Sequence, residues 1–270
     1  MFKDINKVML ITDLDGTLLP HSKVLSDIDL QAIEEFKRKG GLFSIATGRH
    51  YHALSNYLDM LKVNAPIILF NGATIFDTNL NSYIYSQFLS ENCRDLISEI
   101  IKTKPNVCAE ISSLESIYAL QVNDMEIHHN NITKTNPIFC DSLNEVTNEW
   151  VKVILAVEPN EMDDLIKSID IDKHSDMSFV KSCRMFYEIL PQNVSKGNAL
   201  KFLKQKLGLE DYTIVAVGDY NNDIEMMKFA DVSIAPANAC DEVKNISDIV
   251  LDKTCDEGAI AEAIKYIFKK

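Results

Sequence analysis

Apolar and polar residues alternate along the first third of the chain in blocks typical of an α/β fold. Short continuous apolar runs at residues 8–12, 42–46 and 67–70 predict buried strands. Between the first two runs, Ser26 is placed to cap a helix that stops at a pair of glycines, and a second helix is predicted over residues 49–61. Continuous apolar strands separated by helices indicate a parallel sheet covered on both faces.

The last third of the chain resumes this pattern, and the middle differs from it. In the last third, the predicted strands are 213–217, 232–235 and 249–251, and the predicted helices are 196–207, one from about 222, a short one after 235 and one from about 258. The middle mixes alternating segments at 82–88, 116–122 and 184–190 with helical stretches near 93–102 and 161–169.

These blocks predict two domains in one chain. We expect a Rossmann-like, doubly wound, mainly parallel α/β core domain built from residues 1–81 and 191–270. Residues 82–190 are expected to form an inserted α+β domain of ordinary size.

The charge balance limits the classes of partner. The 270 residues include 27 basic and 40 acidic ones, a net charge of −13, which argues against binding to nucleic acid or to an anionic membrane. An anionic small molecule stays possible, because a local cation can reverse the sign within one cleft. No apolar run reaches the length of a membrane span. No obligate protein partner is evident.

The cysteines and the first apolar run indicate the compartment. The six cysteines contain no C-x-x-C pair, so we expect reduced, mostly structural thiols in a cytoplasmic protein. Acidic residues interrupt the N-terminal apolar run and no small-residue cleavage site follows it, so it predicts a strand rather than a signal peptide.

Polar clusters follow four of the predicted strands. They are Asp13 and Asp15 after the first, Thr47-Gly48-Arg49 after the second, Asn71-Gly72 after the third, and residues 218–223 after the strand at 213–217. Ligands of open α/β sheets bind outside the carboxyl ends of the strands, so these clusters predict one site.

Asp13 and Asp15 are the first candidates for chemistry. Strand side chains alternate with period two, so both carboxylates are expected on the same side, where they repel each other unless a cation or a shared proton intervenes. Oxygen ligands favour a hard divalent ion such as Mg²⁺. The alternative is a strand followed by an acidic turn.

Three further positions extend the candidate metal site. Asp219 and Asp223 are four residues apart, so both lie on one face if a helix begins there, and Asn222 offers another oxygen. Together with Asp13 they supply enough ligands for one magnesium ion that keeps some waters. The alternative is an acidic helix N-terminus that interacts with the helix dipole.

Two other segments could bind an anion. Thr47 provides a hydroxyl, and Gly48 lets the following backbone amides point at a ligand, although Thr47 could instead be a simple helix cap. Lys196 begins a predicted helix, where its charge opposes the helix dipole, as happens at functional sites. The alternative for Lys196 is a solvated surface lysine.

The motifs together resemble the haloacid dehalogenase-like (HAD) superfamily, in the Cof-type subclass IIB of sugar-phosphate phosphatases with a large inserted cap. They occur in order along the whole chain as D-L-D-G-T-L at 13–18, A-T-G-R at 46–49, S-K-G at 195–197 and G-D-Y-N-N-D at 218–223. N-G-A at 71–73 also matches the subgroup. One departure is Asn193, where relatives often carry glycine; asparagine tolerates the left-handed conformation.

This resemblance implies a magnesium-dependent phosphoric monoester hydrolase that acts on small phosphorylated metabolites through an aspartyl-phosphate. Asp13 would be the nucleophile, and Asp15 would protonate the leaving group and then activate water. Magnesium would be held by Asp13, the main-chain carbonyl of Asp15 and Asp219, with Asn222 and Asp223 completing or orienting that shell.

The resemblance also implies roles for the anion-binding residues and the inserted segment. Thr47 and Lys196 would hold the phosphoryl oxygens. The insertion would close over the site and contact the leaving group. Candidate substrate contacts are His128, its neighbour His129 and Arg184 there, and Asn71 and Arg49 in the core. An exposed loop and a surface charge are the alternatives for His128 and Arg184.

Two other functions are compatible with these residues. A sugar phosphomutase would use the same site and return the phosphoryl group to a sugar. A non-catalytic phosphometabolite-binding protein belongs to a different class, and a degenerate member of this kind would lack at least one of Asp13, Asp15, Lys196 and Asp219.

Overall fold

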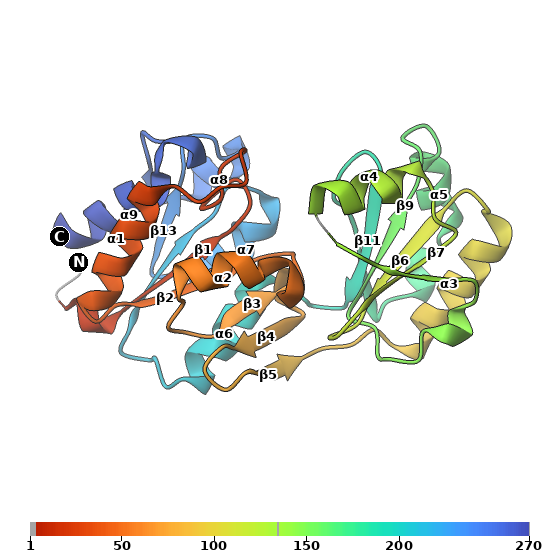
Figure 1. The fold of residues 1–270 in the computed structure, drawn as a ribbon, viewed down its shortest axis with the longest axis horizontal. Coiled ribbons are helices and arrows are strands. Elements are labelled where there is room, and N and C mark those ends of the chain that lie inside the picture. Colours follow the sequence, from red (N-terminus) through yellow and green to blue (C-terminus); the bar gives the residue numbers. More distant parts are fainter. Residues whose placement is uncertain (1–3, 134, 270) are drawn as a thin grey trace. The chain divides into compact units, whose positions relative to one another are not determined.

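The computed structural model describes residues 4–133 and 135–269, which form two compact units (Figure 1). The core unit consists of the described residues up to Tyr85 and from Ser195 onward, and the inserted unit is Ser86–Val194.

The core unit is built on an eight-stranded sheet in the order β14-β13-β12-β1-β2-β3-β4-β5. The strands are β1 (Val8–Asp13), β2 (Leu42–Ala46), β3 (Ile67–Leu69), β4 (Thr74–Asp77), β5 (Ser82–Ser86), β12 (Thr213–Val217), β13 (Val232–Ala235) and β14 (Ile249–Val250). β1 pairs in parallel with β2 on one side and with β12 on the other. The strand order therefore reverses at β1, and such a switch point is where doubly wound sheets bind ligands.

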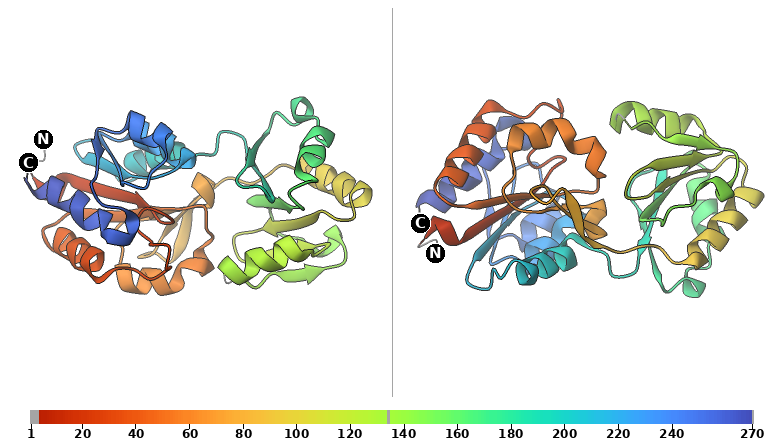
Figure 2. Two further views of the ribbon diagram at one scale, coloured as in Figure 1. Left: turned by 90° about the horizontal axis from the view of Figure 1, so that it is seen from above. Right: turned by 60° about the horizontal axis from the view of Figure 1, so that its bottom comes forward.

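Helices cover both faces of this sheet (Figure 2). They are α1 (Asp27–Arg38), α2 (Ser55–Leu61) and α9 (Ala259–Lys269) on one face, and α6 (Lys196–Lys206), α7 (Ile224–Phe229) and α8 (Asp241–Ile246) on the other. The Ser26 hydroxyl caps α1 by accepting a hydrogen bond from the Asp29 amide, and the buried Asp29 carboxylate accepts from the Ala261 amide of α9 (2.7 Å).

The inserted unit has its own six-stranded sheet in the order β10-β11-β9-β6-β7-β8. The strands are β6 (Cys108–Ser112), β7 (Ile117–Leu120), β8 (Ile138–Cys140), β9 (Lys152–Ala156), β10 (Met177–Lys181) and β11 (Phe186–Pro191). The helices α3 (Glu91–Thr103) and α5 (Met162–Ser168) pack on one face and form the main core of the unit. Helix α4 (Asp124–Thr133) packs on the other face, where Met125 contacts Cys108, Ala119 and Ala156.

Short 3₁₀ helices connect these elements. They are η1 (Ile5–Lys7), η2 (Tyr51–Leu54), η3 (Phe70–Gly72), η4 (Leu143–Glu145), η5 (Ile171–Lys173), η6 (Asn221–Asp223) and η7 (Cys255–Glu257). No helix within the described residues is both long and apolar enough to cross a bilayer.

The α/β fold class is confirmed, and two local predictions differ from the structure. The helix predicted from residue 49 becomes regular only at Ser55, because residues 47–50 form a turn after β2. The domain boundaries also shift: residues 82–85, predicted in the insertion, belong to the core unit, because β5 lies at the edge of the core sheet beside β4. Residues 191–194, predicted in the core, belong to the inserted unit, where Pro191 ends β11. The Asp77 carboxylate organises the turn between β4 and β5 by accepting from the amides of Asn79 and Leu80.

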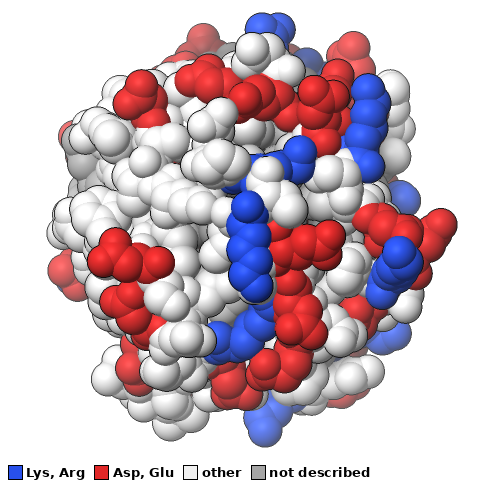
Figure 3. Space-filling view, turned by 90° about the vertical axis from the view of Figure 1, so that its right-hand side faces the viewer, with Lys and Arg blue, Asp and Glu red and all other residues white. Residues whose placement is uncertain are grey.

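Surface charge is mixed on the face of the molecule that Figure 3 presents. Basic side chains lie among acidic ones there. This face therefore has no broad positive field of the kind that attracts a nucleic-acid backbone.

Candidate active site

Asp13, the last residue of β1, is buried beside Lys196, the first residue of α6. The ammonium group of Lys196 donates hydrogen bonds to Asp13 Oδ1 and to Asp223 Oδ1, the latter at 2.6 Å. Lys196 has an exposed fraction of 0%. Burial acts to lower its pKa, but the two carboxylates hold the pKa above its usual value. The sequence-based placement of Lys196 at a helix start thus corresponds to a buried lysine with two acidic partners.

The loop after β12 supplies the other two carboxylates. Asp223 Oδ2 accepts from the backbone amides of Asp219 (3.0 Å) and Tyr220 (3.2 Å), while its Oδ1 accepts from Lys196. Both oxygens of Asp223 are therefore occupied by protein donors. Asp219 Oδ1 accepts a hydrogen bond from the Thr17 hydroxyl at 2.7 Å. Among the described residues, none donates a hydrogen bond to Asp219 Oδ2.

Asp13, Asp219 and Asp223 each offer an oxygen, and these oxygens lie within 4.8 Å of one another. One buried lysine faces three acids, so the cluster carries excess negative charge. Burial raises the pKa of Asp13 well above its usual range, against the opposing charge of Lys196, and burial also raises the pKa of Asp219 to about 6. An oxygen-rich set with unbalanced charge could hold a divalent metal ion.

Gly16 permits the close approach of Asp219. Its φ is +85°, and a Cβ at this position would lie 2.6 Å from Asp219 Oδ2. The Asn238 side chain donates to the Gly16 carbonyl at 2.7 Å and so fixes this turn. Any residue larger than glycine here would displace the Asp219 carboxylate.

Asp15 lies beyond the end of β1 and is bound by two cations. β1 ends at Asp13, and the Asp15 side chain forms a bidentate pair with Arg49 (Nε 2.7 Å, Nη2 2.6 Å) and an ion pair with Lys23 (2.8 Å). Burial acts to raise the pKa of Asp15, but Arg49 and Lys23 outweigh it and hold the pKa below its usual value. The two acids of the D-x-D motif therefore have separate environments.

Thr47, Gly48, Asn71 and Asn222 lie in the neighbouring loops. The buried Thr47 hydroxyl accepts from the Arg49 amide (3.2 Å), and the Thr47 carbonyl accepts from the Asn71 amide. A Cβ on Gly48 would lie 3.0 Å from Asn71 Oδ1, which also accepts from Asn222 Nδ2 at 3.2 Å. The Asn222 side chain thus bonds to that of Asn71.

The loop after β3 is pressed against the start of α6. Phe70, Asn71 and Gly72 all have positive φ, of 50°, 56° and 108°. A Cβ on Gly72 would lie 2.2 Å from the Ser195 carbonyl oxygen. This contact fixes the backbone next to Lys196.

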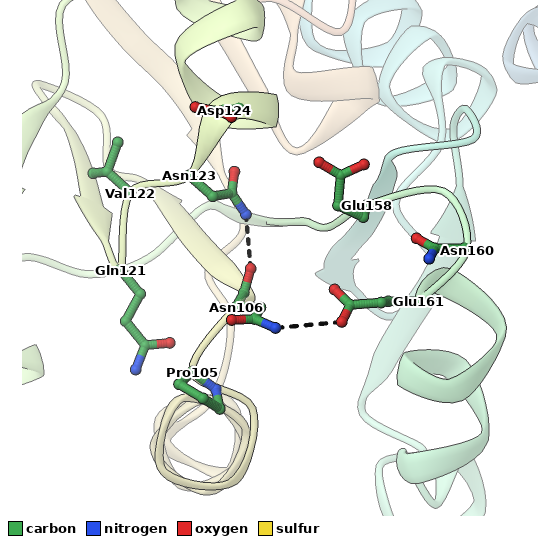
Figure 4. A pocket seen from close by; sticks show the side chains of 9 residues that line it. All are labelled: Pro105, Asn106, Gln121, Val122, Asn123, Asp124, Glu158, Asn160 and Glu161. Atoms are coloured by element: carbon green, nitrogen blue, oxygen red, sulfur yellow. Dashed lines mark hydrogen bonds between the residues drawn. The ribbon is translucent and has the colours of Figure 1, made fainter.

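His128 and Arg184 lie in the inserted unit, where both are exposed. That unit also contains a pocket of about 470 Å³, lined by Pro105, Asn106, Gln121, Val122, Asn123, Asp124, Glu158, Asn160 and Glu161 (Figure 4). Neither residue lines this pocket, and none of the core-unit candidates does. The aspartate cluster is therefore recognised from its chemistry and not from a large cavity.

Thr17, Lys23 and Asn238 bond to the site residues and were not predicted. Thr17 holds Asp219, and Lys23 and Asn238 bond to Asp15 and Gly16. Thr17 is part of D-L-D-G-T, but a threonine in a turn does not reveal a partner 202 residues away. Lys23 and Asn238 carry no sequence signal, since lysine and asparagine are ordinary surface-loop residues.

Comparisons with known proteins agree with the motifs. The profile of the haloacid dehalogenase-like hydrolases matches residues 10–264. A predicted phosphatase of Streptococcus pyogenes serotype M6 is 31% identical over 263 residues, covering 95% of this chain and 97% of that protein. The 5-amino-6-(5-phospho-D-ribitylamino)uracil phosphatase YitU of Bacillus subtilis is 28% identical, covering 96% and 97%.

Comparison with a solved structure supports the same family fold. The crystal structure of TM0651 from Thermotoga maritima superposes with a TM-score of 0.87 at 26% identity, covering 96% of this chain and 97% of that one. The family, fold class and hydrolase class predicted from the sequence are confirmed.

Proposed function

The chain belongs to the haloacid dehalogenase-like hydrolase family, and from this premise we propose that it is a magnesium-dependent phosphatase of small phosphorylated metabolites. The observation that carries the proposal is the buried Asp13 carboxylate, paired with Lys196 and grouped with Asp219 and Asp223 at the switch point of the sheet.

Asp13 is the proposed nucleophile. One carboxylate oxygen of Asp13 attacks phosphorus, the bond to the leaving alkoxide breaks, and an aspartyl-phosphate forms. Lys196 fixes Oδ1 of Asp13 and lowers the repulsion between the carboxylate and a phosphate dianion. Thr47 and the backbone beside Gly48 bind phosphoryl oxygens. Water then gives a proton to Asp15 and attacks the phosphorus, the bond between phosphorus and the Asp13 oxygen breaks, and inorganic phosphate leaves.

The donor set fits magnesium. Asp13 and Asp219 would bind it directly through carboxylate oxygens, together with the main-chain carbonyl of Asp15, and Asp223 would orient Lys196 and the loop after β12. When bound, Mg²⁺ supplies positive charge that neutralises the phosphoryl oxygens. Asn222 acts on this site through Asn71.

Asp15 is the proposed general acid and base. Its ion pairs with Arg49 and Lys23 have to break before it can take up a proton. Held by Arg49 and Lys23, its carboxylate is ionised. Before it can protonate the leaving group, Asp15 has to separate from these cations and gain a proton. Arg49 is then available to bind the anionic substrate.

The proposed substrates are small phosphate monoesters of polyols and sugars. This class includes the phosphoribityl group in the name of the Bacillus subtilis relative. His128 and Arg184 are proposed leaving-group contacts from the inserted unit.

A panel of phosphorylated metabolites tests the proposal. We expect release of inorganic phosphate without any bisphosphate activator, loss of release in excess chelator and recovery on addition of Mg²⁺. Isomerised sugar phosphates that appear only with a bisphosphate would instead show a phosphomutase. Binding without turnover of any panel member would show a non-catalytic protein.

A further inference from the structure

A second cluster of buried ionisable side chains lies within the inserted unit. Glu110 comes from β6, and Glu126 and His129 come from α4. The exposed fractions of Glu110 and Glu126 are 3% and 0%. Each residue has one buried polar atom without a hydrogen-bond partner: Glu110 Oε2, Glu126 Oε2 and His129 Nδ1. His129 Nδ1 and Glu110 Oε2 face each other as an ion pair at 3.4 Å, and Glu126 Oε2 has no hydrogen-bond donor. A buried carboxylate oxygen without a donor is costly, so this arrangement indicates a ligand that the side chains could bind.

The three atoms converge on one point. Glu126 and His129 form an E-x-x-H pair, which places both side chains on one face of α4. Ligand atoms of the three residues lie within 4.8 Å of one another, and His129 Nδ1 is 3.4 Å from Glu110 Oε2. In a tetrahedral zinc site with bonds of 2.0–2.1 Å, neighbouring ligand atoms are about 3.3 Å apart. A small closing movement of Glu126 or His129 would complete this geometry.

The surroundings orient the ligands, and no lysine or arginine among the described residues forms an ion pair with Glu110 or Glu126. Asn130 Nδ2 donates to Glu126 Oε1 at 3.0 Å, and Asn130 Oδ1 accepts from the Thr135 hydroxyl at 2.6 Å. Lys152 acts on Glu110 at longer range, but it is itself paired with Glu188 at 3.4 Å. A hydrogen bond from an outer residue to a ligating carboxylate is typical of metal sites.

We propose that Glu110, Glu126 and His129 bind one divalent transition-metal ion, with Zn²⁺ as the ion best suited to one imidazole and two carboxylates. The fourth position would be taken by water. The ion would join α4 to the sheet of the inserted unit. The proposal does not depend on the phosphatase reaction, because all three ligands lie outside the core unit.

Zinc stoichiometry in the full chain tests the site. Metal-stripped protein is titrated with Zn²⁺ by calorimetry, and bound zinc is counted after desalting. Glu126→Gln keeps the side-chain shape and an acceptor for Asn130, and His129→Ala removes the imidazole. We expect each variant to bind one zinc fewer than wild type. Every variant keeps the aspartate cluster of the core unit, so zinc bound there cancels in the comparison.

His128→Ala is the matched control, because His128 is the exposed neighbour of His129 on the same helix. It should bind as much zinc as wild type. Equal zinc in Glu126→Gln and wild type, or an equal loss in His128→Ala, would overturn the proposal.

Thermal unfolding distinguishes a metal site from the alternative explanation, in which the two carboxyl groups share a proton. Zn²⁺ should raise the melting temperature of wild type and of His128→Ala, but not that of Glu126→Gln. A zinc-induced shift of the same size in Glu126→Gln would contradict the assignment and leave proton sharing as the explanation.

Discussion

The core unit and the inserted unit each contain a buried acidic cluster, and the two clusters differ in how their charge is balanced. In the core, Asp13 and Asp223 share the ammonium group of Lys196, and Asp223 also accepts two backbone amides. In the inserted unit, Glu110 and Glu126 lie near His129, whose Nδ1 is 3.4 Å from Glu110 Oε2, and Glu126 Oε2 has no hydrogen-bond partner.

We interpret this difference as one between a site that can bind and transfer a phosphoryl group and a site that can bind only a metal ion. A lysine beside Asp13 lets the core cluster accept an anion once a metal has neutralised the remaining charge. The cluster on α4 has no lysine or arginine bonded to it within the described residues, so it would repel a phosphate group and suits only a cation.

Removing Lys196 should leave the core cluster without a bonded lysine, like the cluster of Glu110, Glu126 and His129. In Lys196→Met we expect kcat/KM to fall by about 10²–10³ because the phosphoryl charge loses a fixed cation. We also expect metal-free protein to lose about 3–5 kcal/mol of unfolding free energy, since two buried carboxylates lose their partner. Steady-state kinetics and urea unfolding measure the two effects. Lys201→Met, at an exposed site on the same helix, should match wild type; wild-type kinetics in Lys196→Met would refute the role of the lysine.

Substitutions of Asp15 and of Arg49 should distinguish the role of Asp15 in proton transfer from the effect of its ion pair with Arg49. Asp15→Asn should lower kcat by about 10²–10⁴, the usual worth of a general acid. Arg49→Gln should have a smaller effect on kcat at neutral pH. Because Arg49 holds the pKa of Asp15 down, its removal should raise that pKa and move the limb of the pH–rate profile that reports Asp15 to higher pH.

The control for Arg49 is Arg38→Gln, at an exposed site on α1. Its pH profile should superpose on that of wild type. An unmoved limb in Arg49→Gln, or wild-type rates in Asp15→Asn, would exclude Asp15 as the proton donor.

The ionisation of Asp219 should make the stability of the metal-free protein depend on pH, and metal binding should change that dependence. Its folded pKa is raised to about 6, above its usual value, so ionisation destabilises metal-free protein above about pH 6 and this cost disappears as the pH falls towards 4. Asp219→Asn should therefore stabilise metal-free protein at pH 7.5 by about 2 kcal/mol and have little effect near pH 4. With Mg²⁺ the variant should be the less stable protein, because it has lost a ligand.

Urea unfolding at the two pH values, with chelator or Mg²⁺, measures this reversal. Asp211→Asn is the control, since its side chain is 84% exposed and lies just before β12. The same pH dependence in Asp219→Asn and wild type would contradict the link.

The sequence predicts best the features that depend on local pattern. Apolar runs identify β1, β2 and β12, and their polar ends supply Asp13, Thr47 and Asp219. Parallel strands bring such ends to one edge of the sheet, so Asp13 and Asp219 could be expected in one site. Lys196 follows no strand of the core sheet, and only the family resemblance implied its place beside Asp13.

Other features depend on contacts that no local pattern encodes. The ion pairs of Asp15 with Arg49 and Lys23 are one example, because the position of neither cation in the sequence indicates which acid it binds. Helix α4 is only weakly amphipathic, so the sequence did not predict it. The two histidines of this helix were expected together as substrate contacts, whereas in the structure His128 is exposed and His129 Nδ1 lies 3.4 Å from Glu110 Oε2.

The central claim is that Asp13 carries the phosphoryl group, and acid quenching during turnover of a panel substrate tests it most directly. Peptide mass spectrometry should find a phosphoryl group on Asp13, at highest occupancy in Asp15→Asn if hydrolysis is slowed, and none in Asp13→Asn or in chelator. Phosphate release with the phosphoryl group on another side chain, or turnover retained in Asp13→Asn, would contradict the account.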